Sequence, residues 1–162
     1  MNTKELYYAL YHCPVTEPFF DGVYSSDHLE EIVIRPKLII TNTEPSTSSG
    51  AHWLLFFFYG QCVDVFDSYG RDLNFFNYDI QNFTATYAKY VNMSEIAVQP
   101  PQSNICGMLC LYVAYRRCEG ETMRNIIKEI QDNLSSSILF VKKKFKLDCC
   151  CLLPYISLQC EK

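Results

Sequence analysis

A cysteine followed by a glycine, Cys106 and Gly107, opens a long apolar run that ends near Cys118. After Gly107 the run holds no Gly or Pro, as expected of a helix buried in the middle of a domain. Cys106 would then lie in the first turn, where unpaired N–H groups and the helix dipole lower the pKa of a thiol. The helix alone fits either a nucleophile or a buried thiol.

A nucleophilic thiol needs an imidazole to take its proton and an acid or amide to hold that imidazole. The chain has three histidines, His12, His28 and His52. We favour His52 because it lies between a loop and the start of an apolar strand. Asp67 ends the next strand, so an antiparallel hairpin would make it a neighbour of His52. Taken singly, the histidine also fits a structural role and the aspartate a turn cap.

Acyl transfer also requires hydrogen-bond donors for the oxyanion of the tetrahedral intermediate. The backbone N–H of Cys106 would be one donor, and Gln99 and Gln102 are upstream candidates for a side-chain donor. The Pro100-Pro101 pair stiffens this approach, because each proline fixes φ and restricts the residue before it.

The elements that must position these residues indicate an α+β fold. Strands are predicted over 31–42, where Pro36 suggests an edge or bent strand, over 53–59 and 62–67, which form the hairpin, and over 94–98. Helices are predicted over 80–91, over 106–118 and from 121 to 134, whereas 138–141 fits a strand or a helix end. We therefore expect a central mixed or antiparallel sheet flanked by helices, with a buried central helix that carries Cys106 at its N-terminus.

Length and composition predict one globular domain over 1–148, since 162 residues with 49% hydrophobic content bury one sizeable core. The Cys-rich tail, 149–162, is left open between a final strand, a partner-binding segment and a disordered end. No apolar run reaches the roughly 18 residues that span a bilayer, and no secretory signal is visible, so we expect an intracellular protein without a membrane partner.

Charge argues against a general attraction to nucleic acid, because the net charge is −4. The local basic cluster Lys142–Lys146 fits a solvated face, or a contact with nucleic acid or an acidic partner. The nine cysteines are odd in number and predict free thiols. Cys110 and Cys118 are expected to be core thiols. Cys149, Cys150 and Cys151 lack the Cys-x-x-Cys pairs or histidines of a zinc site, so no metal is predicted.

Three segments resemble, in order, those of the adenain-like cysteine proteases, the family of the adenovirus maturation protease within the wider Ulp-type clan. They are "PFFDGVYSSD", "GAHWLLFFFYGQCVDVFDSYG" around the histidine and the acid, and "VQPPQSNICGMLCLYV" around the cysteine. The resemblance extends to about Leu147 and implies a papain-like or Ulp-like cysteine protease fold.

The resemblance implies a role for each candidate residue. It assigns His52 as the general base, Asp67 as the residue that orients it, and Cys106 as the nucleophile. Gln99, seven residues before Cys106, falls where the family has its oxyanion glutamine, and Gln102 falls where the adenovirus enzyme has an asparagine. Trp53 would cover a narrow channel that admits small side chains before the scissile bond, with Gly50 and Gly107 as further substrate-binding residues.

These features predict a monomeric cysteine endopeptidase that cleaves after glycine in viral or element-encoded precursor proteins, in the host cytoplasm or nucleus or in the virion. One alternative is a protease acting on ubiquitin or a ubiquitin-like modifier, and another is an inactive module that binds a glycine-rich tail. The family enzyme uses a disulfide-linked peptide and DNA as activators. Because this chain has no cysteine from Val63 to Ile105 and is acidic, we predict that it requires no cofactor.

Overall fold

A computed structural model describes residues 1–147, and the Cys-rich tail predicted at 149–162 lies outside this range. A five-stranded mixed sheet forms its centre, with the strand order β1-β2-β3-β4-β5. The strands are β1 Phe20–Ser25, β2 Leu38–Asn42, β3 Trp53–Tyr59, β4 Cys62–Phe66 and β5 Tyr90–Met93. β3 is antiparallel to both of its neighbours, whereas β1 pairs with β2, and β5 with β4, in parallel. The predicted α+β class with a mixed central sheet is confirmed.

This topology gathers several loops at one edge of the sheet. Because β3 runs opposite to the other four strands, its first residue lies at the edge where β1, β2, β4 and β5 end. The segments that follow those four strands, and the segment before β3, therefore converge there. Loops on such an edge, held by a rigid sheet, are where functional side chains are commonly placed.

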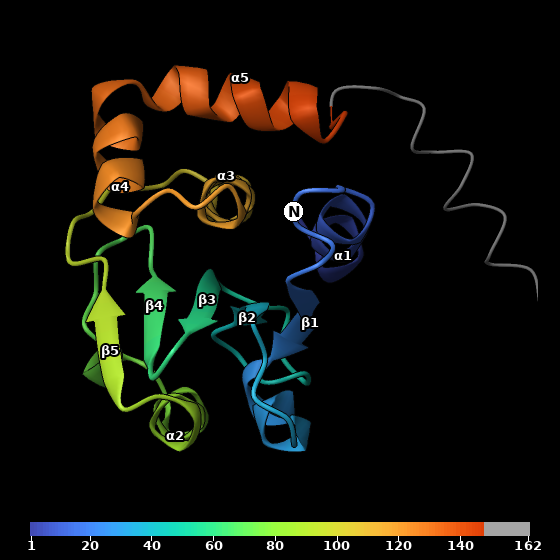
Figure 1. Cartoon of the computed structure of the whole chain (residues 1–162), viewed down its shortest axis with the longest axis vertical. Helices are drawn as coiled ribbons and strands as arrows, with labels where there is room; N and C mark the ends of the chain where they lie inside the picture. The colour runs from blue at the N-terminus through green and yellow to red at the C-terminus, as the bar shows by residue number, and fades with distance from the viewer. Residues whose placement is uncertain (148–162) are drawn as a thin grey trace, which may run out of the picture.

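Helices cover both faces of the sheet (Figure 1). One face carries α1 Thr3–Tyr11, α3 Cys106–Cys118, α4 Met123–Asp132 and α5 Leu134–Lys144. The other carries α2 Tyr78–Tyr87, which packs on the 3-10 helix η1 Ser26–Glu31, and a short 3-10 turn, η2 Leu73–Phe75, precedes α2. The helices within residues 1–147 are all too short or too polar to traverse a bilayer.

The central strand β3 is buried on both faces, which explains its unbroken apolar sequence. Leu55 and Phe57 belong to the core beneath α3, whereas Leu54, Phe56 and Phe58 belong to the core beneath α2. Successive side chains of a strand point to opposite faces, so one strand contributes to both cores.

The helix α3 has the bounds that its apolar pattern predicted. It packs between β3 and α5, with α1 beside it, and its middle residues are completely buried. Arg117 in its last turn forms a largely buried ion pair with Asp64 of β4, at 2.9 Å between Nη2 and Oδ2. The helix is thus held against the sheet along its length, and its N-terminus at Cys106 is fixed at the loop-bearing edge.

The prediction for 31–42 was wrong in extent and in position. The strand β2 begins only at Leu38 and lies inside the sheet, between β1 and β3. The carboxylate of Asp21 accepts the backbone N–H groups of Lys37 and Leu38, and Arg35 donates to the carbonyl oxygens of Tyr87 and Cys62. These contacts hold the residues around Pro36 outside the hydrogen-bonded strands of the sheet. At that place the missing N–H of a proline breaks no strand pairing.

The segment between the hairpin and α3 also differs from the prediction. The helix predicted over 80–91 ends at Tyr87, and the strand predicted at 94–98 lies at Tyr90–Met93 instead. Side chains of β5 are mostly exposed, so this strand is held by backbone pairing with β4, and its sequence has no apolar alternation. Ser94, expected in the strand, instead binds the backbone of Asp67.

Three helical segments were not predicted as the structure has them. The predicted helix from 121 to 134 is two helices, because Asn133 ends α4 and its side chain caps α5 at Ser136. Residues 138–141, left open between strand and helix, lie within α5. The N-terminal α1 was not anticipated, although Asn2 and Glu5 form a capping box that the spacing displays.

Candidate active site

The hairpin of β3 and β4 places His52 beside Asp67, as its predicted geometry requires. Leu55 pairs with Phe66 in the antiparallel register, so the residue before β3 and the residue after β4 lie at the same end. His52 Nε2 is 2.6 Å from Asp67 Oδ1, and both side chains are buried. The backbone carbonyl of His52 also accepts the N–H of Thr43, which fixes the residue against the loop after β2.

The carboxylate of Asp67 is completely buried and densely hydrogen-bonded. Besides His52, it accepts the backbone N–H groups of Tyr69 and Arg71, and the Arg71 guanidinium donates to both of its oxygens. Burial alone would raise the pKa of Asp67, but the bonds from His52 and Arg71 and from the two backbone N–H groups hold it well below its usual range. Asp67 is therefore an anion at neutral pH.

Arg71 is a site residue that the sequence reasoning missed. Its guanidinium lies over the rings of Tyr69, Phe75 and Phe76, at 4.6–5.1 Å from their centroids. This aromatic surround orients the guanidinium toward the carboxylate. The signal was the spacing in "FDSYGR", since Arg71 follows Asp67 by four residues across a tight turn.

Cys106 is the first residue of α3, and no side chain caps that helix end. Burial tends to raise the pKa of the Cys106 thiol, but its interaction with His52 and the backbone N–H groups of Trp53 and Gly107 lower it below the ordinary value. The pKa of His52 is raised: burial opposes this, and the bonds to Asp67 and Cys106 outweigh burial. Because Asp67 takes Nε2 of the imidazole, Nδ1 is the nitrogen left for the thiol. The arrangement can therefore hold a thiolate beside an imidazolium.

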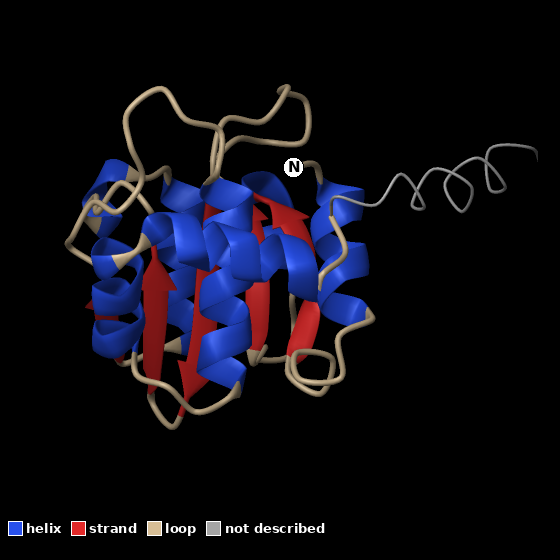
Figure 2. Ribbon diagram, turned by 90° about the horizontal axis from the view of Figure 1, so that it is seen from above, coloured by secondary structure: helices blue, strands red, loops and turns tan. Residues whose placement is uncertain are grey.

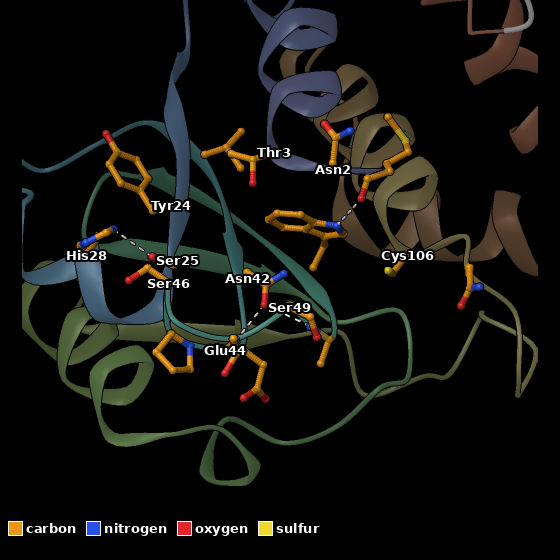
Figure 3. Close-up of a pocket in the computed structure, with 18 of the residues that line it drawn as sticks. Asn2, Thr3, Tyr24, Ser25, His28, Asn42, Glu44, Ser46, Ser49 and Cys106 are labelled. Carbon is orange, nitrogen blue, oxygen red and sulfur yellow. Dashed lines mark hydrogen bonds between the residues drawn. The ribbon is translucent and has the colours of Figure 1, made fainter.

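A pocket of about 650 Å³ opens beside Cys106 at the loop-bearing edge (Figure 3). Cys106 lies at one end, and Tyr24 and His28 lie at the other. Trp53 and Gly50 also line this pocket. The walls come from the N-terminal residues, the ends of β1 and β2, and the loop before β3, so the pocket is built by the segments that the topology gathers.

Of the three residues expected to bind substrate, Trp53 and Gly50 line the pocket, whereas Gly107 lies behind Trp53. Its indole N–H donates to the carbonyl of Met1 at 3.1 Å, and its side chain is largely buried. Gly107 packs against both residues, because a Cβ added there would lie 3.0 Å from the Met1 Cβ and 3.4 Å from Trp53. Gly50 adopts φ +79°, and a Cβ there would lie 2.8 Å from the Asn42 amide nitrogen. Gly50 and Trp53 thus reach the pocket, and Gly107 supports the tryptophan.

The two glutamines predicted as oxyanion donors are placed differently. Gln99 is buried, and its carboxamide oxygen accepts the Ser68 hydroxyl at 2.6 Å. Its nitrogen donates to the Tyr69 hydroxyl at 2.9 Å and to the Ser103 carbonyl at 2.6 Å. Gln102 is exposed and adopts φ +65°. The structure therefore joins Gln99 to the turn after Asp67 and leaves Gln102 at the surface.

The cysteines within residues 1–147 are all free thiols. Cys110 is completely buried one turn below Cys106, and burial raises its pKa well above the ordinary value. Burial likewise raises the pKa of Cys118 to about 12. Both fit the predicted core role, and the reactive microenvironment is that of Cys106. Within the described range no group of three or more His, Cys, Asp or Glu side chains is placed to hold a metal ion.

No protein-family model matches the chain, and no curated protein matches it significantly.

Proposed function

We propose that this protein is a cysteine endopeptidase of the adenain-like type, with Cys106 as nucleophile, His52 as general base and Asp67 as the residue that orients the imidazole. The observation that carries the proposal is the position of His52, which bonds Asp67 at 2.6 Å and interacts with the Cys106 thiol. The lowered pKa of Cys106 and the raised pKa of His52 are the shifts that an activated thiol–imidazole pair requires.

In the proposed reaction the Cys106 thiolate attacks the carbonyl carbon of the scissile peptide bond. A C–S bond forms, and the carbonyl π electrons move to oxygen. When the tetrahedral intermediate collapses, the C–N bond breaks and the His52 imidazolium gives its proton to the leaving amine. Water then attacks the thioester, His52 takes a proton from it, and the thiol and the carboxylic acid are released.

The substrate class rests on the resemblance and on the shape of the site. Trp53 and Cys106 line the same pocket, and the indole is pinned by its bond to Met1. A fixed aromatic wall next to the nucleophile favours a small residue before the scissile bond. We therefore propose cleavage after glycine, in viral or element-encoded precursors.

The test compares labelling and turnover by wild type, Cys106→Ala and Asp67→Asn. Wild type should hydrolyse a fluorogenic peptide ending in Gly-Gly, and a peptide vinyl sulfone should alkylate it at Cys106. Cys106→Ala should do neither. Asp67→Asn should retain the fold and lose about 10⁴-fold in kcat, because the imidazole loses its orienting anion. Equal labelling of wild type and Cys106→Ala would refute the proposal.

The same probes distinguish the proposed endopeptidase from the two alternatives, a deconjugating protease and an inactive binding module. If ubiquitin or ubiquitin-like vinyl sulfones label Cys106 while short peptide probes leave it unlabelled, the protein is a deconjugating protease. If a glycine-ended peptide binds but no probe reacts, the inactive binding module is supported. The paired Asp67, His52 and Cys106 favour the active forms over that module.

A further inference from the structure

Asn42 ends β2 on the face of the sheet that α3 covers. Leu38 and Ile40 of the same strand belong to the core beneath α3, and side chains two residues apart in a strand share a face. In the antiparallel register Asn42 lies opposite Trp53, so the two side chains are neighbours on that face. Both line the pocket, and Figure 3 shows Asn42 between Cys106 and the far end of the pocket.

The loop before β3 fixes the orientation of the Asn42 carboxamide. Its oxygen accepts the backbone N–H of Glu44 at 2.9 Å and that of Ala51 at 3.3 Å. Only the oxygen of a carboxamide accepts hydrogen bonds, so these two N–H groups determine which way the amide faces. Asn42 is only 9% exposed. The direction of its own N–H groups is therefore set before a ligand arrives.

The nitrogen of this carboxamide is a donor without a partner. Within residues 1–147 Asn42 Nδ2 makes no hydrogen bond. Among the described residues, Arg117 Nε is the one unpaired side-chain nitrogen or oxygen that is fully enclosed, so Asn42 Nδ2 reaches the open space of the pocket. A Cβ on Gly50 would lie 2.8 Å from this nitrogen, so the missing side chain of Gly50 leaves the donor uncovered.

A substrate that is cleaved after glycine presents mainly backbone groups near the scissile bond, because glycine has no side chain. The carbonyl oxygens of an extended peptide are acceptors that suit a fixed amide donor. Trp53, the aromatic wall of the proposed substrate site, lies opposite Asn42 in the sheet. Resting on the proposed function, we infer that Asn42 is a substrate-binding residue, whose Nδ2 donates to a backbone carbonyl oxygen of the residues before the scissile bond.

The test measures peptide binding in the Cys106→Ala background, where hydrolysis and the charge of the thiol play no part. Asn42→Asp keeps an oxygen for the two backbone N–H groups of the loop and removes the donor. Asn77→Asp is the matched control, because the Asn77 amide donates to the Thr43 carbonyl of the same loop and lies outside the pocket. Fluorescence anisotropy of a labelled peptide ending in Gly-Gly gives the Kd.

Asn42→Asp should weaken peptide binding by about 10–100-fold, because the carbonyl of the substrate loses its donor inside the site. In the enzyme that retains Cys106, the same change should raise KM and leave kcat near wild type, as expected for binding lost equally in the ground and transition states. Asn77→Asp should leave the Kd near that of the Cys106→Ala background.

Peptides in which one amide oxygen at a time is replaced by sulfur, a poorer acceptor, identify the carbonyl. One such peptide should bind more weakly than its oxygen parent when Asn42 is present, and this difference should disappear in Asn42→Asp. A difference that persists for every peptide would show that Asn42 contacts none of these carbonyl groups.

The outcomes separate the role of Asn42 from the protease itself. An unchanged Kd in Asn42→Asp, or an equal loss in Asn77→Asp, would overturn the assignment, and hydrolysis by wild type would then leave the protease proposal intact. If wild type neither hydrolyses nor is labelled at Cys106, but the peptide binds and Asn42→Asp weakens it, the protease proposal fails and the Asn42 site stands. Absence of any peptide binding would refute the Asn42 site.

Discussion

Arg71 binds the Asp67 carboxylate through two side-chain bonds, Nε to Oδ2 at 2.7 Å and Nη2 to Oδ1 at 3.2 Å. His52 shares the second of these oxygens, at 2.6 Å. One buried carboxylate thus carries a permanent cation on one side and the imidazole on the other. The permanent cation keeps the acid ionised, because the guanidinium stays charged at all relevant pH values.

Arg71→Met should therefore reduce stability in a pH-dependent way. The folded-state pKa of Asp67 is depressed, so its contribution to stability is present above the unfolded pKa of about 3.9 and is lost as the pH falls through the folded value. Removing the guanidinium raises that folded pKa. Urea unfolding should show a loss of about 1–3 kcal/mol at pH 7, shrinking as the pH falls below 3.9. A loss independent of pH would contradict this role.

Cys106 should remain reactive at a pH where an ordinary thiol, with a pKa of about 8.5, is mostly protonated. Its pKa is lowered, so the thiolate persists as the pH falls past that value and disappears only below the shifted pKa. Site-resolved mass spectrometry of iodoacetamide labelling against pH measures the midpoint. His52→Ala should move it upward, and Cys118, with its pKa of about 12, is an internal control that should stay unlabelled at neutral pH.

The Asp64–Arg117 pair should govern stability and leave the chemistry unchanged. Asp64 pairs with Phe57 in the hairpin register, several residues from the edge that carries Asp67. Asp64→Ala should cost about 3–5 kcal/mol in urea unfolding, because it leaves a largely buried guanidinium without its anion. Replacing both partners, as Asp64→Leu with Arg117→Met, should recover most of that loss. In the folded variants kcat and KM should match wild type, and a change in either would tie this pair to the site.

Gly50 and Gly60 offer a matched pair of substitutions. Both adopt left-handed backbone conformations, with φ of +79° and +49°. A Cβ on Gly50 would clash with Asn42 at 2.8 Å, whereas a Cβ on Gly60 would meet nothing within 4 Å. Each alanine should cost about 1–2 kcal/mol of stability through backbone strain. Gly50→Ala should cost more than Gly60→Ala and should also raise KM for the Gly-Gly peptide, and an unchanged KM would remove Gly50 from the substrate site.

The sequence predicted the parts of the fold whose pattern is local. The hairpin around Gly60 and the helix from Cys106 to Cys118 are continuous apolar segments bounded by turn residues or charges, and both were placed correctly. The prediction placed the last strand at 94–98 instead of at β5. The side chains of β5 are mostly exposed, and backbone pairing with β4 fixes its position, so its sequence shows no hydrophobic periodicity.

The sequence predicted that His52 and Asp67 lie side by side, and it did not predict the hydrogen bonds around them, including those of Arg71. The pairing of His52 with Asp67 follows from hairpin geometry. By contrast, the partners of Gln99 depend on side-chain directions in a loop of irregular structure. Spacing alone does not show that the Gln99 amide faces inward, toward Ser68 and Tyr69.

The tip of the β3–β4 hairpin lies at the end of the sheet opposite to His52 and Asp67, because those residues flank the open end of the same hairpin. Figure 2 shows loops leaving the strands at both ends of the sheet. Gly60 at this tip has open space around it. Surface loop tips of this kind accept added residues at little cost. A fluorescent or affinity peptide inserted there would stay at the far end of the strands that carry His52 and Asp67, clear of the pocket beside Cys106, which makes this turn a suitable attachment point for a reporter of where the protein goes in a cell.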